Sequence, residues 1–264
     1  MLLLLLLVLV GMAVGATTVL FGFGGGFVTV PVIAVADIAL GGDAIRVATA
    51  TSALVMLVNA IVATVSLPRG MLRRLRGRAL LFVLLGVGGA VGAAAARLAP
   101  DELLRWGFVA YIGVTILDLL LRPGFFLPVE SGPDTERGSA VPDVLGAPIG
   151  AVAAFLGVGG SVMTVPLMRR AGAAMPVAAG LANPLTLAIV APALIVSLLF
   201  RGEMPASAGL VGSVDVVSAA ALLIGSIPVV LLLRRCPPRI PAQVHAWTYV
   251  GLLVAAGATV AVVR

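Results

Sequence analysis

The sequence is poor in the residues from which most active sites and metal sites are built. It contains one cysteine, Cys236, and one histidine, His245. One cysteine cannot form an intramolecular disulfide or a cysteine-based metal site, and the sequence has no HExxH, Walker A or Ser-His-Asp arrangement. We therefore expect no enzyme activity, no catalytic residue, no bound metal and no cofactor.

Charged residues are equally scarce. Only 11% of the 264 residues are charged and 61% are hydrophobic, with a mean hydropathy of +1.20. Apolar runs of roughly 20 residues, the length of a helical membrane crossing, recur along the chain and do not alternate as barrel strands do. The composition predicts an all-α polytopic membrane protein. The net charge of +6 then indicates cytoplasmic loops rather than a nucleic-acid partner.

A glycine motif occurs twice, 135 positions apart. Residues 22–31 are GFGGGFVTVP and residues 157–166 are GVGGSVMTVP, so that three glycines, the threonine and the proline coincide. Each copy lies between two apolar runs, which predicts a helix that ends, opens its backbone at the glycines and resumes. Backbone groups freed inside a bilayer must face protein, a cavity or a ligand. The repeated break therefore predicts a transport pathway.

The repetition divides the chain into two tandem halves. We expect a first transmembrane repeat at residues 1–121, a polar cytoplasmic linker at 122–143 and a second transmembrane repeat at 144–264. Residues 1–20 lack the basic start of a secretory signal, and they either cross the membrane or form one arm of a re-entrant hairpin. The apolar runs predict helices at residues 1–20, 23–40, 46–67, 79–98, 103–121, 144–157, 162–168, 176–200, 206–233 and 246–263.

The arginines favour one arrangement of the two halves. Eight plain crossings with a cytoplasmic N-terminus would divide the 17 arginines 9 to 8 between the two sides. If each glycine motif is instead the tip of a re-entrant hairpin, 12 arginines lie on the cytoplasmic side and 5 outside. Because arginine is enriched in cytoplasmic loops, the sequence predicts two inverted repeats. Each contains a broken, re-entrant helical hairpin and three transmembrane helices.

Each break offers the N-terminus of the resumed helix, where free N–H groups and a partial positive charge bind oxyanions without a buried cation. Paired broken helices build the substrate site of many secondary transporters. When Val47 is aligned with Val177, Asn183 corresponds to Ala53, which follows Thr51 and Ser52. We therefore add Asn183 to the predicted site. The predicted substrate-binding residues are Gly24, Gly25, Gly26, Thr29, Thr51, Ser52, Gly159, Gly160, Ser161, Thr164 and Asn183.

Helix packing and bonding within a helix are the alternative roles for these residues. Small residues also serve close helix packing in membranes. Ser or Thr in a helix often bonds its own backbone, which is the alternative role for Thr49, Thr51 and Ser52. Packing is the role that we expect for one further group of glycines, which comprises Gly86, Gly88, Gly89 and Gly92.

Three acids, Asp37, Asp118 and Asp215, lie near apolar segments. Ionisable groups at membrane depth are functional candidates. Asp118 precedes Arg122 by four residues, so we expect an ion pair between them. Asp215 falls about 12 Å along the helix predicted at residues 206–233. It is our candidate for proton coupling, and a buried hydrogen-bonding role is the alternative.

The two glycine motifs, written with their neighbours as GFGGGFVTVP, VATATSALV and FLGVGGSVMTVP, resemble those of the sulfite exporter TauE/SafE family of membrane permeases. The resemblance covers essentially the whole chain. It implies transport of sulfite, organosulfonates such as sulfoacetate, or other small sulfur-containing anions. It also carries over Gly24–Gly26, Thr51, Ser52 and Gly159–Ser161 as site positions. The second half departs from the pattern, because it has GLANP in place of the run around Thr51.

The sequence thus predicts a secondary transporter for small sulfur-containing anions in the cell membrane of a prokaryote, with proton coupling as one mode of energisation. A passive anion channel and a non-transporting membrane scaffold or subunit are the alternatives. The expected partners are the anion and the lipid bilayer. The identity of the anion, the direction of transport and the oligomeric state, a homodimer included, stay open.

Overall fold

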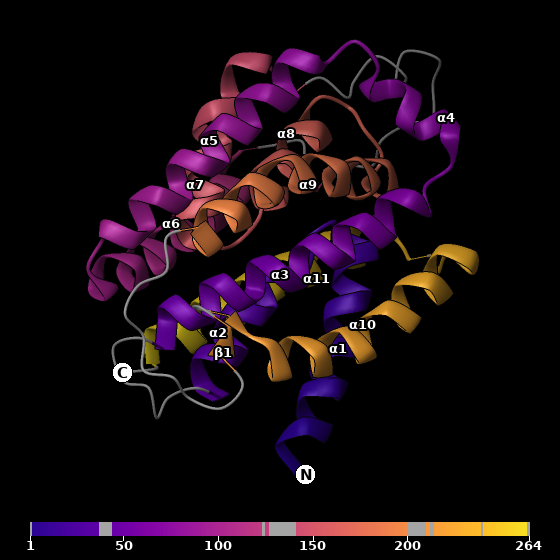
Figure 1. Cartoon of the computed structure of the whole chain (residues 1–264). Helices are drawn as coiled ribbons and strands as arrows, with labels where there is room; N and C mark the ends of the chain where they lie inside the picture. The colour runs from indigo at the N-terminus through magenta and orange to yellow at the C-terminus, as the bar shows by residue number, and fades with distance from the viewer. Residues whose placement is uncertain are drawn as a thin grey trace.

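The computed structural model describes residues 2–36, 44–122, 125–126, 141–199, 210–211, 214–238 and 240–262. Helices make up most of this part of the chain (Figure 1). A two-stranded antiparallel sheet pairs Leu210 with Asp215 and Val211 with Val214. The elements are α1 Leu2–Phe21, α2 Gly26–Ala36, α3 Ala44–Val65, α4 Arg69–Leu72, η2 Arg73–Leu75, α5 Ala79–Leu98, α6 Asp101–Leu121, η4 Asp143–Leu145, α7 Gly146–Leu156, α8 Ser161–Arg170, α9 Met175–Leu199, β1 Leu210–Val211, β2 Val214–Asp215, α10 Val216–Arg235 and α11 Ala242–Val262.

Seven described helices are long and apolar enough to cross a membrane, namely α1, α3, α5, α6, α9, α10 and α11. This confirms the prediction of an all-helical, polytopic membrane protein. Of the four helices beside the glycine motifs, α1 has 20 residues and the other three are shorter: α2 and α7 have 11 residues and α8 has 10. At 1.5 Å per residue they extend roughly 15–17 Å, about half of a bilayer core.

Most predicted helix positions agree with the structure, and the helix predicted at residues 79–98 has those bounds. The helix predicted at residues 206–233 is wrong at its start, because α10 begins only at Val216. Asp215 caps that helix with its side chain, so it does not lie inside it. Asp37 and most of the predicted linker at 122–143 fall outside the described residues.

The two halves of the chain pack on each other through pairs of long helices. The most extensive contacts join α1 to α10 and α5 to α7, so the first helix of each half lies against a crossing of the other half. A Cβ on Gly15 would collide with the carbonyl oxygen of Ser226, and a Cβ on Gly150 would collide with that of Leu85. Glycine is needed at these positions because the backbones touch there.

The glycines of α5 that we assigned to packing mostly have that role. A Cβ on Gly88 or Gly92 would strike the α7 backbone at Ala147 or Ala151. A Cβ on Gly89 would strike the α9 backbone. Gly86 makes only ordinary contact, with its nearest neighbour atom 3.4 Å from the Cβ position.

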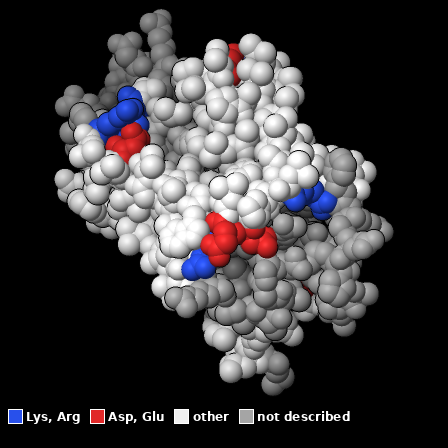
Figure 2. All heavy atoms as spheres, turned by 90° about the vertical axis from the view of Figure 1, so that its left-hand side faces the viewer, with Lys and Arg blue, Asp and Glu red and all other residues white. Residues whose placement is uncertain are grey.

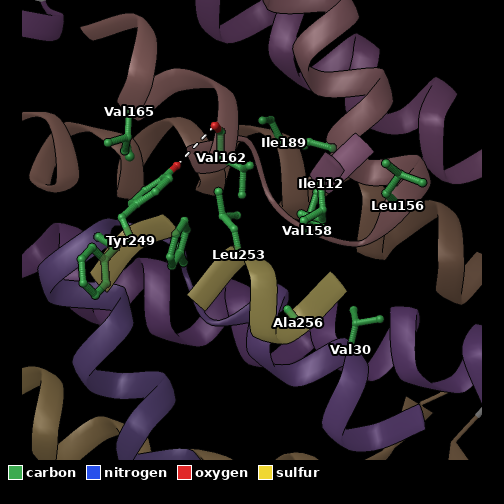
Figure 3. Packing of buried hydrophobic residues seen from close by; sticks show 14 of the residues in the cluster. Val30, Ile112, Leu156, Val158, Val162, Val165, Ile189, Tyr249, Leu253 and Ala256 are labelled. Carbon is green, nitrogen blue, oxygen red and sulfur yellow. Dashed lines mark hydrogen bonds between the residues drawn. The ribbon is translucent and has the colours of Figure 1, made fainter. Parts of the chain in front are cut away.

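The core between the glycine motifs and α11 is apolar and aromatic. Tyr249 of α11 is fully buried and donates a hydrogen bond of 3.3 Å to the carbonyl oxygen of Val162 at the start of α8 (Figure 3). Its ring centroid lies 4.7 Å from that of Phe23, which belongs to the first glycine motif. One tyrosine of α11 therefore contacts both motifs.

Ion pairs gather the polar ends of several helices at one end of the molecule. Arg170 Nη2 lies 2.7 Å from Asp118 Oδ2, and Arg122 Nε lies 3.1 Å from Asp118 Oδ1. The predicted pair of Asp118 with Arg122 is therefore confirmed. Arg78 Nη2 lies 2.6 Å from Asp143 Oδ1. Among the described residues on the face shown in Figure 2, charged side chains form a few small groups surrounded by uncharged ones.

Candidate functional site

Both glycine motifs interrupt a helix. In the first, α1 ends at Phe21 and α2 begins at Gly26, and Gly22, Gly24 and Gly25 between them have φ of 73°, 63° and 100°. A positive φ is strained for residues with a side chain, so these glycines permit the break.

In the second motif, α7 ends at Leu156 and α8 begins at Ser161. Gly157 and Gly159 have φ of 68° and 71°. The first two coinciding glycines of the motif therefore share the same left-handed conformation in both copies.

The two breaks lie against each other inside the protein. A Cβ on Gly26 would lie 2.8 Å from the carbonyl oxygen of Gly157, and one on Gly159 would lie 3.7 Å from that of Phe23. Ser52 of α3 bridges them, because its Oγ is 3.3 Å from the Gly26 carbonyl oxygen and 3.4 Å from that of Gly157. A hydroxyl has one proton to donate, so Ser52 serves one carbonyl at a time.

Two side chains from the long helices lie beside both breaks. Thr186 Cγ2 of α9 is 3.2 Å from the Cβ position of Gly24 and also 3.2 Å from that of Gly159. Met56 Sδ of α3 is 3.1 Å from the Cβ position of Gly159, and Met56 Cγ is 3.6 Å from that of Gly24. Both side chains are buried. The backbone turns of the two halves and the middles of α3 and α9 thus share one buried place.

The hydroxyls of the predicted site differ in how far they are already bonded. Thr29 Oγ1 donates 2.6 Å to the Gly25 carbonyl oxygen of its own helix. Thr51 Oγ1 accepts a hydrogen bond of 2.9 Å from the Asp215 amide. Ser161 Oγ and Thr164 Oγ1 are fully buried and find no hydrogen-bond partner in the described part of the chain.

Thr164 is the counterpart of Thr29 in the motif, so the two copies differ in the donors that they leave free. The Thr29 hydroxyl is used by its own backbone, as is common for Ser and Thr in helices. Ser161 and Thr164 keep a hydroxyl that a ligand can use.

Asn183 lies on the first-break side, at the junction of α9 with the end of α1. Its Nδ2 is 3.0 Å from the Ala179 carbonyl oxygen and 3.4 Å from that of Thr18. A Cβ on the neighbouring Gly22 would lie 2.5 Å from the same Ala179 oxygen. The amide of Asn183 therefore bonds backbone on the α1 side of the break.

Asp215 stands at the N-terminus of α10. Its carboxylate accepts hydrogen bonds from the amides of Val217 at 3.0 Å and Ser218 at 3.1 Å. Its own amide donates to Thr51. Asp215 is thus connected to α3 by the hydrogen bond to the Thr51 hydroxyl, and its side chain caps the N-terminus of α10.

Two polar side chains at the breaks were not among the predicted site residues, namely Asn59 of α3 and Thr186 of α9. Both have 0% exposure. Asn59 Nδ2 lies 3.4 Å from the Cβ position of Gly25. A signal was present in the sequence, because a lone Asn in the apolar run LVMLVNAIV is unusual at membrane depth.

The breaks combine two helix N-termini with neutral polar side chains. The amides of Val28 and Thr29 bond the Gly25 carbonyl, and those of Met163 and Thr164 bond the Gly160 carbonyl. The amides that precede these in each helix have no acceptor within the helix. The start of each helix therefore presents free N–H donors and a partial positive charge. Within the described ranges, no cluster of three His, Cys, Asp or Glu is placed to hold a metal ion.

A comparison with protein families gives a match over nearly the whole chain. The family model described as Sulfite exporter TauE/SafE matches residues 7–260, which include both glycine breaks and every residue of the candidate site. Comparisons with curated proteins and with solved structures gave no match. The agreement extends over both halves of a multi-pass membrane protein, which has seven candidate membrane-spanning helices in its described part. The chain belongs to the sulfite exporter TauE/SafE family.

Proposed function

We propose that the protein is a secondary transporter for small sulfur-containing anions, such as sulfite or an organosulfonate. The anion is held where the two glycine breaks meet, by the N-termini of α2 and α8. The observation that supports this proposal is that Met56 and Thr186 each lie against both breaks, at Gly24 and at Gly159. The glycines that precede α2 and α8 therefore border one buried place. Helix N-termini bind oxyanions through amide donors and the helix dipole.

We propose further that the halves are inverted repeats. The glycine motifs align at an offset of 135 residues, and the long helices α3 and α9 align at an offset of 130, which pairs Val47 with Val177. With these alignments, equivalent residues surround the two breaks. The neighbours are Val14 and Asn59 at Gly25, Ile149 and Ile189 at Gly160, and the shared pair of Met56 and Thr186 at Gly24 and Gly159. Reciprocal contacts of this kind are expected for two repeats related by a twofold axis.

The segment from α7 to α8 is proposed to be re-entrant, because both its ends are held at one end of the molecule. The turn between Leu98 and Asp101 is too short for α5 and α6 to be other than antiparallel, so Arg78 and Asp118 lie together at the end opposite this turn. Asp143 before α7 is paired with Arg78, and Arg170 at the end of α8 is paired with Asp118. The distribution of arginines makes this end cytoplasmic.

We propose that transport is coupled to protons through Asp215. Its carboxylate caps α10 and its amide bonds Thr51, so a change in its ionisation acts both on a helix end and on a helix of the site. The multi-pass topology and the family place the protein in a membrane, and we propose the cytoplasmic membrane of a prokaryote.

The experiment is transport in liposomes. Purified protein in sealed vesicles is offered labelled sulfite or a labelled organosulfonate, with and without a pH gradient. We expect saturable uptake that accumulates the anion against its gradient, and loss of uptake in Gly26→Leu with wild-type behaviour in Gly113→Ala. Gly113 of α6 is the matched control, because a Cβ there meets nothing within 4 Å.

Flux that neither saturates nor accumulates would indicate a channel. An absence of flux for all sulfur anions, in vesicles that contain folded protein, would contradict the proposal.

A further inference from the structure

Asn59 presents a free amide donor to the first glycine break. Ser226 Oγ of α10 lies 2.8 Å from Asn59 Oδ1, and the other acceptor within reach of its hydroxyl, the Leu223 carbonyl, is 3.5 Å away. In the structure the Ser226 hydroxyl donates to Asn59 Oδ1, so the amide nitrogen of Asn59 faces away from Ser226. Its Nδ2 has no partner among the described residues and lies beside Gly25.

Thr186 presents a second donor between the two breaks. Its Oγ1 is buried and, within the described segments, makes no hydrogen bond. Its methyl group lies 3.2 Å from the Cβ positions of Gly24 and Gly159, and the hydroxyl is bonded to the same carbon as this methyl group. A buried polar group without a partner is costly, which a ligand that accepts its hydrogen bond relieves.

Both donors belong to rigid helices and flank adjacent residues of the same break. Met56 and Asn59 are three residues apart and so share one face of α3, with Met56 beside Gly24 and Asn59 beside Gly25. In the second half, Ile189 stands at the position that corresponds to Asn59, and in the first half Met56 corresponds to Thr186. Neither donor therefore has a polar counterpart in the other half. The site is therefore asymmetric in its side chains while its backbone is repeated.

We propose that Asn59 Nδ2 and Thr186 Oγ1 bind the head group of the transported anion, and that Ser226 holds the Asn59 amide for this task. This inference rests on the proposed transport function. The donors are neutral, and the acid that reaches this region, Asp215 through Thr51, is itself negative when ionised. Burial of a charge costs free energy that rises with the square of the charge. The site thus favours a head group with one negative charge over a divalent one.

The test uses the natural protein first. Vesicles take up labelled sulfite at a pH low enough for singly charged hydrogensulfite to predominate over divalent sulfite. Methanesulfonate, which has one charge, competes for this uptake, and divalent sulfate competes at least about tenfold less well. Equal competition by the two ions would overturn the charge preference. The absence of any sulfite uptake is a failure of the proposed transport function itself, so the two failures are distinguishable.

Variants then test the two donors. Thr186→Val keeps the shape but removes the hydroxyl, and Asn59→Asp keeps the bond from Ser226 but replaces the donor by an acceptor. Loss of a hydrogen bond to a charged ligand raises KM about tenfold or more, and Thr186→Ser restores it. Ser226→Ala raises KM in the natural background and has no further effect in Asn59→Asp.

The matched control is Thr17→Val, because Thr17 is also buried but its hydroxyl already bonds the Val14 carbonyl at 3.0 Å. It leaves KM unchanged. Thermal unfolding of each purified variant separates misfolding from loss of binding, and Asn59→Asp carries the test if Thr186→Val does not fold. A natural KM in folded Thr186→Val or in folded Asn59→Asp would overturn the assignment.

Discussion

At the scale of single residues, the candidate site has two components. Glycines with positive φ allow the helix breaks, and a few buried hydroxyls and amides beside them have no hydrogen-bond partner among the described residues. Positive φ at Gly22, Gly24, Gly157 and Gly159 turns the backbone, and Ser52 holds the two turns together. The free donors are then set by the packing of other helices. These two layers have different consequences for substitution.

A first prediction concerns the backbone layer. Gly157→Ala adds a Cβ that would lie 2.7 Å from Thr49 Cγ2, at a φ of 68°. The left-handed conformation alone costs about 1–2 kcal/mol for alanine, so the variant unfolds at a lower temperature than the natural protein. Gly251→Ala in α11 meets nothing within 4 Å and serves as the control, with an unchanged or higher unfolding temperature. Equal stability of both variants would contradict the packing described for the break.

A second prediction separates the capping role of Asp215 from its proposed role in proton coupling. Asparagine caps helices about as well as aspartate but does not titrate, whereas alanine loses about 1 kcal/mol of capping. Asp215→Asn therefore keeps the thermal stability and loses the stimulation of uptake by a pH gradient, and Asp215→Ala loses both. Stimulation that survives in Asp215→Asn would show that the residue is a cap alone.

The sequence predicts the breaks and several site residues because they rest on local rules. Glycine tolerates positive φ, and the motif repeats, so Gly24 and Gly159 could be found without a structure. For Asn59 the sequence offered only a lone Asn in an apolar run, and for Thr186 it offered no signal. Their positions beside the breaks come from the approach of α3 and α9. Whether Thr29 or Thr164 bonds its own helix is likewise decided by small differences in packing.

At the scale of elements, helix contacts between the halves depend on glycines that the sequence analysis did not single out. Gly11 and Gly15 of α1 are the counterparts of Gly146 and Gly150 of α7, at the same offset of 135 as the motifs. Each contacts backbone or a side chain close to the backbone of a helix from the other half. The sequence analysis did not identify these paired glycines, because an apolar run predicts a helix but does not indicate which helix packs against it.

A third prediction follows for these helix pairs. Gly15→Leu and Gly150→Leu each destabilise the protein by about 1–3 kcal/mol or more, since overpacking forces the helices apart. Gly86→Ala, whose Cβ position is 3.4 Å from the nearest atom, serves as the control. Thermal unfolding in detergent measures all three. A large effect of Gly15→Leu without one of Gly150→Leu would argue against equivalent packing in the two halves.

The boundary of α10 shows why element prediction fails at helix starts. Apolar residues continue on both sides of Asp215, so hydrophobicity alone extends the helix too far. The side chain of Asp215 bonds the amides of Val217 and Ser218, and this cap, a local polar signal, marks the start.

At the scale of the whole molecule, the proposed topology requires that certain helix ends lie on the same side of the membrane. Asp215 bonds Thr51 and Ser226 bonds Asn59, so α3 and α10 run parallel and end together. Cys236 follows α10 and is exposed. It therefore lies at the same end as the arginines from Arg69 to Arg78, which the charge rule makes cytoplasmic.

A fourth prediction tests this orientation. A thiol reagent that does not cross membranes labels Cys236 in inside-out vesicles and not in intact cells. Pro100→Cys in a Cys236→Ser background, at the turn between α5 and α6, shows the opposite pattern. Labelling of both positions from one side would contradict the proposed topology.

The most direct test of the central claim is a structure with a bound anion that can be located without ambiguity. A crystal of the protein soaked with 2-bromoethanesulfonate gives a bromine signal and a sulfonate group. The account predicts the sulfonate between Gly24–Gly26 and Gly159–Ser161, within hydrogen-bonding distance of the first amides of α2 and α8. A sulfonate bound elsewhere in the protein, with none at the two breaks, would contradict it.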